Sequence, residues 1–209
     1  MTYRIDHAVF VVRDLDAAAA RWSASYGLAS SPGGRHPRWG TANRIVPLGP
    51  DYLELISVVE PGVAAGTVLG RTLLDLAAGG DRWFSLCLAD DDLEGTAARL
   101  GLEVEPGSRT TPDGDEVRWR GAGIDAPQRE PWLPFFIAWD VAPEHHPGRA
   151  AADHHVDVLG VSSAEIAGDP ERMRAWLGGE DVPIRVVAGE PALRSVSLRL
   201  AGGGELVVT

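Results

Sequence analysis

The sequence predicts an α+β fold in which repeated βαβββ modules form an open, curved mixed sheet or barrel around a central cleft. Two observations predict this fold class. Each stretch that reads as a helix is followed by several short strands, and not by the single strand of a parallel doubly wound sheet. This order also recurs, because the aspartates that open three helices, Asp14, Asp90 and Asp169, lie about 76 and 79 residues apart.

The first repeat begins with a strand at residues 5–12, in which both faces are mostly apolar and His7 is set into one of them. Asp14 then caps a helix whose apolar residues recur at helical spacing until Gly27 ends it. A loop that starts at Gly33 leads into two strands joined by a turn, at residues 41–48 and 52–59.

The same order is expected twice more. A connecting helix and the second repeat are predicted at residues 66–78, 83–88, 90–101, 102–105, 116–120 and 133–139. The third repeat has strands at 161–166, 184–187, 193–200 and 205–208, with a helix opened by Asp169-Pro170. We therefore divide the chain into a first module (1–60), a connecting helix (61–80), a second module (81–141), a Pro/His-rich link (142–156) and a candidate third module (157–209).

Composition narrows the classes of partner. The chain of 209 residues has 30 acidic and 19 basic residues and a formal charge of -11. This balance disfavours nucleic acid and favours a cationic ligand, although acidity can serve solubility alone. No stretch approaches a membrane span or a signal core, and Cys87 is the only cysteine. We therefore expect a cytoplasmic protein without membrane or nucleic-acid partners.

Several short motifs together indicate a family. They are Asp6-His7, Asp14-Leu15, Gly34, His36, Trp39-Gly40-Thr41, Asn43, Tyr52-Leu53-Glu54-Leu55-Ile56 and His146-Pro147-Gly148. With them the chain resembles the vicinal oxygen chelate superfamily, and within it the glyoxalase-like domain branch; the first 60 residues match best. The resemblance implies tandem βαβββ modules that form an open barrel around a small-molecule pocket. It also implies isomerase, epimerase, dioxygenase or thiol-transfer chemistry, or drug sequestration without catalysis.

The resemblance places a metal-ligating histidine and carboxylate at His7 and Glu54. These ligands suit zinc, nickel, manganese or iron, but a usable site needs three or four. The counterparts of His7 in the other repeats are Trp83 and Ser162, which are not usual ligands. Two alternatives stay open. Either a divalent metal is completed by histidines of the link, or no metal binds and His7 and Glu54 form a hydrogen-bonded acid/base pair.

Other side chains are candidates for contacting a ligand: His36, Trp39, Thr41, Asn43, Trp139, His145 and His146. Trp39 offers an apolar wall or a cation–π face. Thr41 and Asn43 are two residues apart and share a face if extended, although Asn43 can instead brace the backbone. Four histidines between residues 145 and 155 suggest a further site, although histidine pairs are often surface residues.

Two functions follow from these residues. The first is a glyoxalase-like enzyme, a lyase or isomerase, which acts on a small oxygenated metabolite around His7 and Glu54. The second is a non-catalytic protein of the bleomycin-resistance type, which binds a drug or another cationic ligand. A homodimer fits either function, because modules of this kind often pair between subunits.

Overall fold

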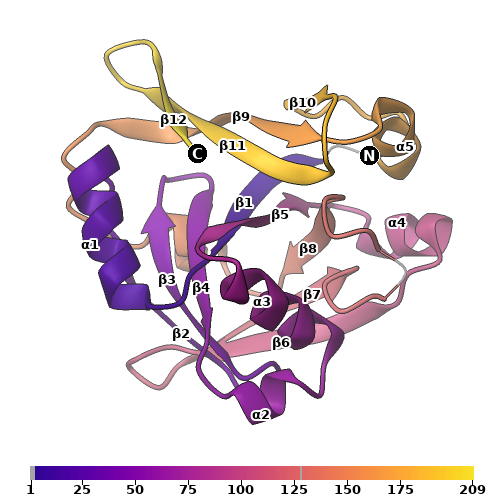
Figure 1. The fold of residues 1–209 in the computed structure, drawn as a ribbon, viewed down its shortest axis with the longest axis horizontal. Helices are drawn as coiled ribbons and strands as arrows, with labels where there is room; N and C mark the ends of the chain where they lie inside the picture. Colours follow the sequence, from indigo (N-terminus) through magenta and orange to yellow (C-terminus); the bar gives the residue numbers. More distant parts are fainter. Residues whose placement is uncertain (1–2, 128) are drawn as a thin grey trace.

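The computed structural model describes residues 3–127 and 129–209. Within them the order of one strand, one helix and three strands occurs three times (Figure 1). The first repeat consists of β1 (Arg4–Val11), α1 (Leu15–Tyr26), β2 (Ser31–His36), β3 (Thr41–Pro47) and β4 (Tyr52–Val58). Two helices, α2 (Pro61–Ala64) and α3 (Val68–Ala78), connect it to the next repeat.

The second and third repeats have the same order. The second consists of β5 (Arg82–Ala89), α4 (Leu93–Leu100), β6 (Val104–Thr110), β7 (Glu116–Ala122) and β8 (Phe135–Trp139). Two short 3-10 turns follow, η1 (Pro143–His145) and η2 (Pro147–Arg149). The third consists of β9 (Val158–Ala167), α5 (Pro170–Trp176), β10 (Ile184–Val187), β11 (Ala192–Leu200) and β12 (Glu205–Val208). The exact module boundaries stay a prediction.

The first two repeats form one eight-stranded barrel, in the order β1-β4-β3-β2-β6-β7-β8-β5. The repeats meet along two seams. Strands β1 and β5 pair antiparallel over most of their length, whereas β2 and β6 meet through Arg35 and Thr110. The α+β class and the curved sheet are thus confirmed, and the sheet closes on itself, which leaves an interior lined by alternate residues of each strand.

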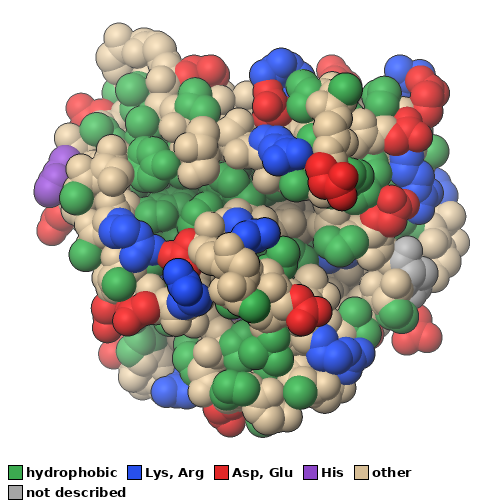
Figure 2. All heavy atoms as spheres, viewed as in Figure 1, with side chains coloured by type: hydrophobic (Ala, Val, Ile, Leu, Met, Phe, Trp, Pro, Cys, Tyr) green, Lys and Arg blue, Asp and Glu red, His purple; other side chains and the backbone are tan. Residues whose placement is uncertain are grey.

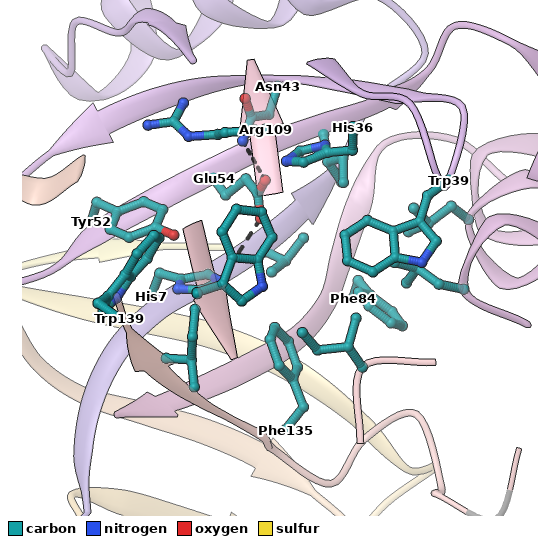
Figure 3. A pocket seen from close by; sticks show the side chains of 17 residues that line it. His7, His36, Trp39, Asn43, Tyr52, Glu54, Phe84, Arg109, Phe135 and Trp139 are labelled. Carbon is teal, nitrogen blue, oxygen red and sulfur yellow. Dashed lines mark hydrogen bonds and ion pairs between the residues drawn. The ribbon is translucent and has the colours of Figure 1, made fainter. Parts of the chain in front are cut away.

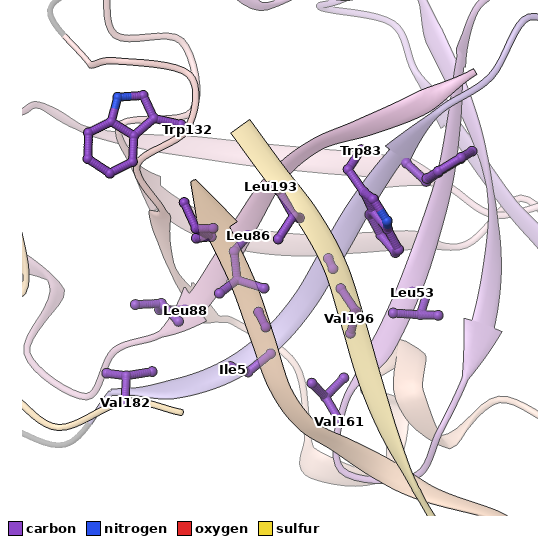
Figure 4. Packing of buried hydrophobic residues seen from close by; sticks show 14 of the residues in the cluster. Ile5, Leu53, Trp83, Leu86, Leu88, Trp132, Val161, Val182, Leu193 and Val196 are labelled. Atoms are coloured by element: carbon purple, nitrogen blue, oxygen red, sulfur yellow. The ribbon is translucent and has the colours of Figure 1, made fainter. Parts of the chain in front are cut away.

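The third repeat forms a separate four-stranded sheet, β10-β9-β11-β12, which lies against the outside of the barrel. Figure 4 shows Val161 and Val196 of this sheet close to Ile5, Leu53 and Leu86 of the barrel. The shared apolar cluster covers the outer faces of β1 and β5, between α1 and α4 (Figure 1). The interior of the barrel is therefore left to the first two repeats.

One segment predicted as a loop is a strand. Residues 31–36 form β2, which pairs with β3. The sequence Pro32-Gly33-Gly34 reads as a loop because proline and glycine are poor strand residues. At Gly33, however, an added Cβ would collide with the Asn43 side chain. Glycine is thus required here by a close approach of side chains, which no local pattern reveals.

The cap of α4 also differs from the prediction. Asp92, and not Asp90, is the N-cap and accepts from the backbone N–H of Gly95. Asp14 and Asp169 cap α1 and α5 as predicted. Counting back from Asp92 makes Ser85 the counterpart of His7 in the second repeat. Serine is likewise no usual metal ligand.

The surface on one side of the molecule is mixed in charge. Figure 2 shows basic and acidic side chains interspersed on that face, with apolar atoms between the third sheet and the barrel. Among the described residues, no helix has both the length and the apolar character needed to cross a membrane.

Candidate functional site

A cavity lies inside the barrel, and neighbouring strands of the first repeat supply most of its polar groups (Figure 3). The alternation of side chains along β1 turns His7 and Val9 inward. Strand β4 pairs parallel with β1, with Tyr52 opposite His7 and Glu54 opposite Val9. Both β4 residues also line the cavity, so the histidine and the carboxylate lie on adjacent strands.

The opposite wall comes from the second repeat and is mainly aromatic and aliphatic. Its residues are Phe84, Arg109, Trp119, Ile124, Phe135, Ile137 and Trp139. The free space is about 590 Å³ including the open mouth, but the centre of a water molecule can reach only about 60 Å³ of it. A ligand of the cavity in this form therefore has to be small and largely apolar.

Asp6 orients His7 from behind. Oδ1 of Asp6 lies 2.6 Å from Nδ1 of His7. Oδ2 of Asp6 accepts from Nε1 of Trp139 at 2.9 Å and from Nε2 of His146 at 3.2 Å. His146 is itself fixed, because the backbone N–H of Gly148 donates to its Nδ1. The buried carboxylate thus has three side-chain partners, one of them from the Pro/His-rich link.

These partners lower the pKa of Asp6. Burial alone would raise the pKa of Asp6, but the hydrogen bonds from His146 and His7 hold it well below its ordinary value. An ionised Asp6 can only accept, so Nδ1 of His7 carries a proton, and in the neutral form of the ring the lone pair is on Nε2. Tyr52 stacks on the imidazole with ring centres 4.4 Å apart, and Phe135 meets its edge.

Glu54 faces the free nitrogen of His7. Oε2 of Glu54 lies 3.8 Å from Nε2 of His7, which is ion-pair distance but too long for a hydrogen bond. Its other oxygen, Oε1, accepts from Nδ2 of Asn43 at 2.5 Å. The hydrogen bond predicted between His7 and Glu54 is therefore wrong: Asp6 bonds His7, and Asn43 bonds Glu54. A substrate atom that contacts both groups would therefore lie beside the pair, on the cavity side, and not between them.

His36 and Thr41 act as a unit at the β2–β3 turn. Nδ1 of His36 lies 3.0 Å from Oγ1 of Thr41. His36 lines the cavity, whereas Thr41 is buried behind it and does not. Burial lowers the pKa of His36 to about 4, against an opposing effect of Glu54. His36 is therefore neutral at physiological pH and able to exchange hydrogen bonds with a ligand.

Trp39 closes one end of the cavity beside Trp119, with ring centres 6.4 Å apart. The guanidinium of Arg38 already lies 5.6 Å from the Trp39 ring. This contact fits an apolar wall better than a cation–π site for a ligand. Trp139 also lines the cavity, and its indole N–H is used by Asp6.

The link histidines are placed differently from one another. His146 reaches Asp6, whereas His145 is exposed and does not line the barrel cavity. His154 bonds the backbone of Pro47 and Ala29, and His155 is exposed. The structure therefore brings together His7, His36, Trp39, Asn43, Glu54 and Trp139, with Thr41 and His146 directly behind them, and leaves His145 outside.

A divalent metal needs open donor atoms, and few are present. Among the described residues, only Asp6, His7 and Cys87 bring three ligand atoms within 4.8 Å of one another. Asp6 already accepts three hydrogen bonds, and burial raises the pKa of the Cys87 thiol, so the thiolate that metals prefer is disfavoured. Nε2 of His7 and the carboxylate of Glu54 are open and lie 3.8 Å apart, but among the described residues no third histidine, cysteine or carboxylate ligand atom lies within 4.8 Å of both. The residues present do not form a complete metal site.

The sequence does not reveal the roles of two residues of the site. Asp6 belongs to the Asp6-His7 motif, but adjacency in sequence does not show that its side chain turns toward His7. Arg109 on β6 lies beyond the predicted strand 102–105, in the sequence Gly-Ser-Arg-Thr-Thr, and is not among the predicted site residues. Its only local signal would have been a strand that continues to residue 110.

The chain is similar to known proteins in sequence and in fold. A family model described as a glyoxalase-like domain matches residues 5–179. A structure of a hypothetical protein from Staphylococcus aureus has 17% identity and a TM-score of 0.77, over 96% of this chain and 92% of that chain. It shows a shared fold. No curated protein matches.

Smaller solved proteins match part of the chain. A variant of the methylmalonyl-CoA epimerase from Streptomyces coelicolor, in complex with 2-nitronate-propionyl-CoA, has 20% identity and a TM-score of 0.47, over 68% of this chain and 100% of that chain. The methylmalonyl-CoA epimerase from Mycobacterium tuberculosis has 17% identity and a TM-score of 0.45, over 64% and 86%.

Proposed function

We propose that this chain, which belongs to the glyoxalase-like domain family as its sequence predicted, catalyses proton transfer within a small oxygenated metabolite. The reaction class is isomerase or lyase. One observation carries the proposal: Asp6 holds Nδ1 of His7, and the free Nε2 faces Glu54 inside the cavity. A carboxylate-oriented imidazole in such a cavity is suited to general acid/base catalysis.

The step uses only side chains of the site. Nε2 of His7 removes a proton from a carbon next to a carbonyl group, the electron pair of the C–H bond forms a C=C bond, and the π pair of the carbonyl group moves to its oxygen. Glu54 then stabilises the imidazolium, with its oxygen 3.8 Å from Nε2. In a 2-hydroxy carbonyl compound, return of the proton to the former carbonyl carbon, with the proton of the hydroxyl group passing to the other oxygen, completes an isomerisation. In an elimination the carbonyl group re-forms, and a group on the next carbon leaves with its bonding electron pair and takes up the proton.

Tyr52 supports the same step. Burial raises the pKa of Tyr52, so the phenol stays protonated and can donate a hydrogen bond. Figure 3 shows its hydroxyl directed toward the centre of the site. The developing negative charge on a substrate oxygen would therefore have a fixed donor.

Exchange of substrate protons with solvent tests the proposal. Small 2-hydroxy and 2-oxo compounds are incubated with the protein in D2O, and loss of the C–H signal is followed by NMR. We expect exchange in the wild type and at least a ~100-fold loss in His7→Gln, the range of general acid/base contributions. His155→Gln, an exposed histidine, is the control. Equal exchange in the wild type and His7→Gln would contradict the proposal.

A binding protein without catalysis is the second candidate. The aromatic wall and the short set of metal donors favour it. The buried guanidinium of Arg109 in the cavity argues against the cationic ligand that the acidic composition suggested. Tight binding of a small compound with no exchange in any compound tested would support this candidate. The cytoplasmic location and the homodimer stay predictions.

A further inference from the structure

We infer that the ligand of the barrel carries a carboxylate, which the guanidinium of Arg109 binds inside the cavity. The inference rests on the proposed function in one respect, because it assumes that the same cavity receives the metabolite. It goes further by naming the charged group that the metabolite has to present.

Arg109 is buried without a partner. It lies on β6, is 8% exposed, and lines the cavity beside His36 and Glu54. Its Nη1 is buried and unbonded, and its side chain makes no hydrogen bond or ion pair with any residue in the described ranges 3–127 and 129–209. A guanidinium stays charged at all physiological pH values, and a buried charge without a partner is strongly unfavourable. An anion from outside the chain would supply that partner.

A second buried arginine shows the contrast. Arg129 is also 8% exposed, but it donates to the carbonyl oxygens of Gly123 and Leu133 and to Oγ of Ser85. Its charge is thus satisfied within the fold, as is usual for a structural arginine. Arg109 has none of these contacts, although its five N–H groups could donate several hydrogen bonds. The difference marks Arg109 as a group that faces a ligand.

Gly33 and Asn43 pack closely around one end of the Arg109 guanidinium. An added Cβ at Gly33 would lie 2.8 Å from Nη1 of Arg109 and would collide with Oδ1 of Asn43. Oδ1 of Asn43 is also buried without a partner. Even if a small shift let this oxygen accept one N–H of Arg109, four N–H groups would remain. Because Nη1 is buried against Asn43 and Gly33, the parallel pair for a carboxylate would come from Nε and Nη2, for which the described residues supply no hydrogen-bond partner.

The cavity selects among anions. Its accessible space is about 60 Å³ and most of its wall is apolar, which suits a short carbon chain with one planar charged end. A carboxylate matches the flat fork of a guanidinium in two parallel hydrogen bonds. Inorganic phosphate presents a larger, tetrahedral and more strongly hydrated anion. The carboxylate is therefore the expected ligand group, despite the overall charge of -11.

Quenching of tryptophan fluorescence tests the inference, because Trp39, Trp119 and Trp139 line the cavity. The probes are propionate and lactate, their neutral amides, and inorganic phosphate. We expect the two carboxylates to bind at least ~10-fold more tightly than the amides, and Arg109→Met to lose that preference. Arg118→Met, at an exposed arginine on the neighbouring strand β7, should bind as the wild type does.

Folding is checked by thermal unfolding without ligand. Because an unpaired buried charge is removed, Arg109→Met should be at least as stable as the wild type. If Arg109→Met fails to fold, the comparison of carboxylate with amide in the wild type and in Arg109→Lys still decides. Equal binding of acids and amides by the wild type, or binding of phosphate alone, would overturn the inference.

The two proposals fail in different ways. His7→Gln should still bind propionate, since it keeps Arg109. Carboxylate binding without proton exchange in the wild type would overturn the proposed function and support this inference. Proton exchange in neutral compounds, with no preference for acids, would overturn this inference alone.

Discussion

The two halves of the barrel have the same order of strands but carry different chemistry. The half built by β1 to β4 contributes polar residues to the cavity: His7, His36, Asn43, Tyr52 and Glu54. The half built by β5 to β8 contributes mainly apolar ones: Phe84, Trp119, Ile124, Phe135, Ile137 and Trp139. We infer that one half performs the reaction while the other encloses the substrate and, through Arg109, holds its charged end.

Equivalent positions make the difference concrete. His7 on β1 lines the cavity, whereas its counterpart Ser85 on β5 does not and instead forms hydrogen bonds within the fold. Oγ of Ser85 donates to the carbonyl oxygen of Leu133 and accepts from Arg129. A repeated backbone therefore does not imply a repeated site, because the side chain at each position finds its own partners.

The largest effect after loss of His7 itself is expected for Asp6→Asn. The amide nitrogen would face the N–H groups of Trp139 or His146, and the fixed proton on Nδ1 of His7 would be lost. We expect proton exchange to fall by ~10–100-fold, as for other groups that orient an imidazole. NMR exchange in D2O measures it, with Asp113→Asn at an exposed aspartate as the control. Wild-type exchange in Asp6→Asn would show that Asp6 does not orient His7 for proton transfer.

A pH effect on stability is expected from His36. Burial lowers the pKa of His36 from 6.5 to about 4, so between these values the unfolded chain binds more protons than the folded one. Stability from this group is complete above pH 6.5 and falls as the pH falls toward 4, by at most about 3 kcal/mol.

Denaturation in urea at pH 7, 5.5 and 4.5 checks this expectation. The loss on acidification should be smaller in His36→Gln than in the wild type, whereas His155→Gln should follow the wild type. An identical loss in all three proteins would show that His36 is not held neutral inside the first half.

A smaller effect is expected on the apolar half. Trp139→Phe keeps a ring in the wall but removes one of the three hydrogen bonds to Asp6, which is worth about 1 kcal/mol. We expect proton exchange to fall about 5-fold, and Trp119→Phe, which makes no contact with Asp6, to change it less. If Trp139→Phe reduced proton exchange as much as Asp6→Asn does, the half built by β5 to β8 would also take part in the reaction.

The smallest effect is expected from chelators. Because no third ligand atom joins His7 and Glu54 within 4.8 Å among the described residues, EDTA should leave the unfolding temperature unchanged, and purified protein should hold less than one metal ion per chain. Elemental analysis of the wild type, His7→Ala and Glu54→Ala checks it. A stoichiometric ion that both variants lose would instead establish a metal site.

The sequence alone was sufficient for the features that local patterns encode. Apolar alternation predicted the strand that carries His7, and aspartate caps predicted α1 and α5. Short strands after each helix predicted the α+β class, and the motifs of the first 60 residues predicted the family. These signals are local because strand period, capping and turns depend on neighbours in sequence.

Only the tertiary structure decided which side chains meet. In the folded chain Asp6 bonds His7, and Glu54 bonds Asn43. Residues 31–36 form a strand, and Arg109 lines the cavity. Each of these depends on strands that are far apart in sequence, such as β2 and β6 at the seam. Hydrogen-bond partners and burial are set by that long-range packing, so no local period or propensity could have predicted them.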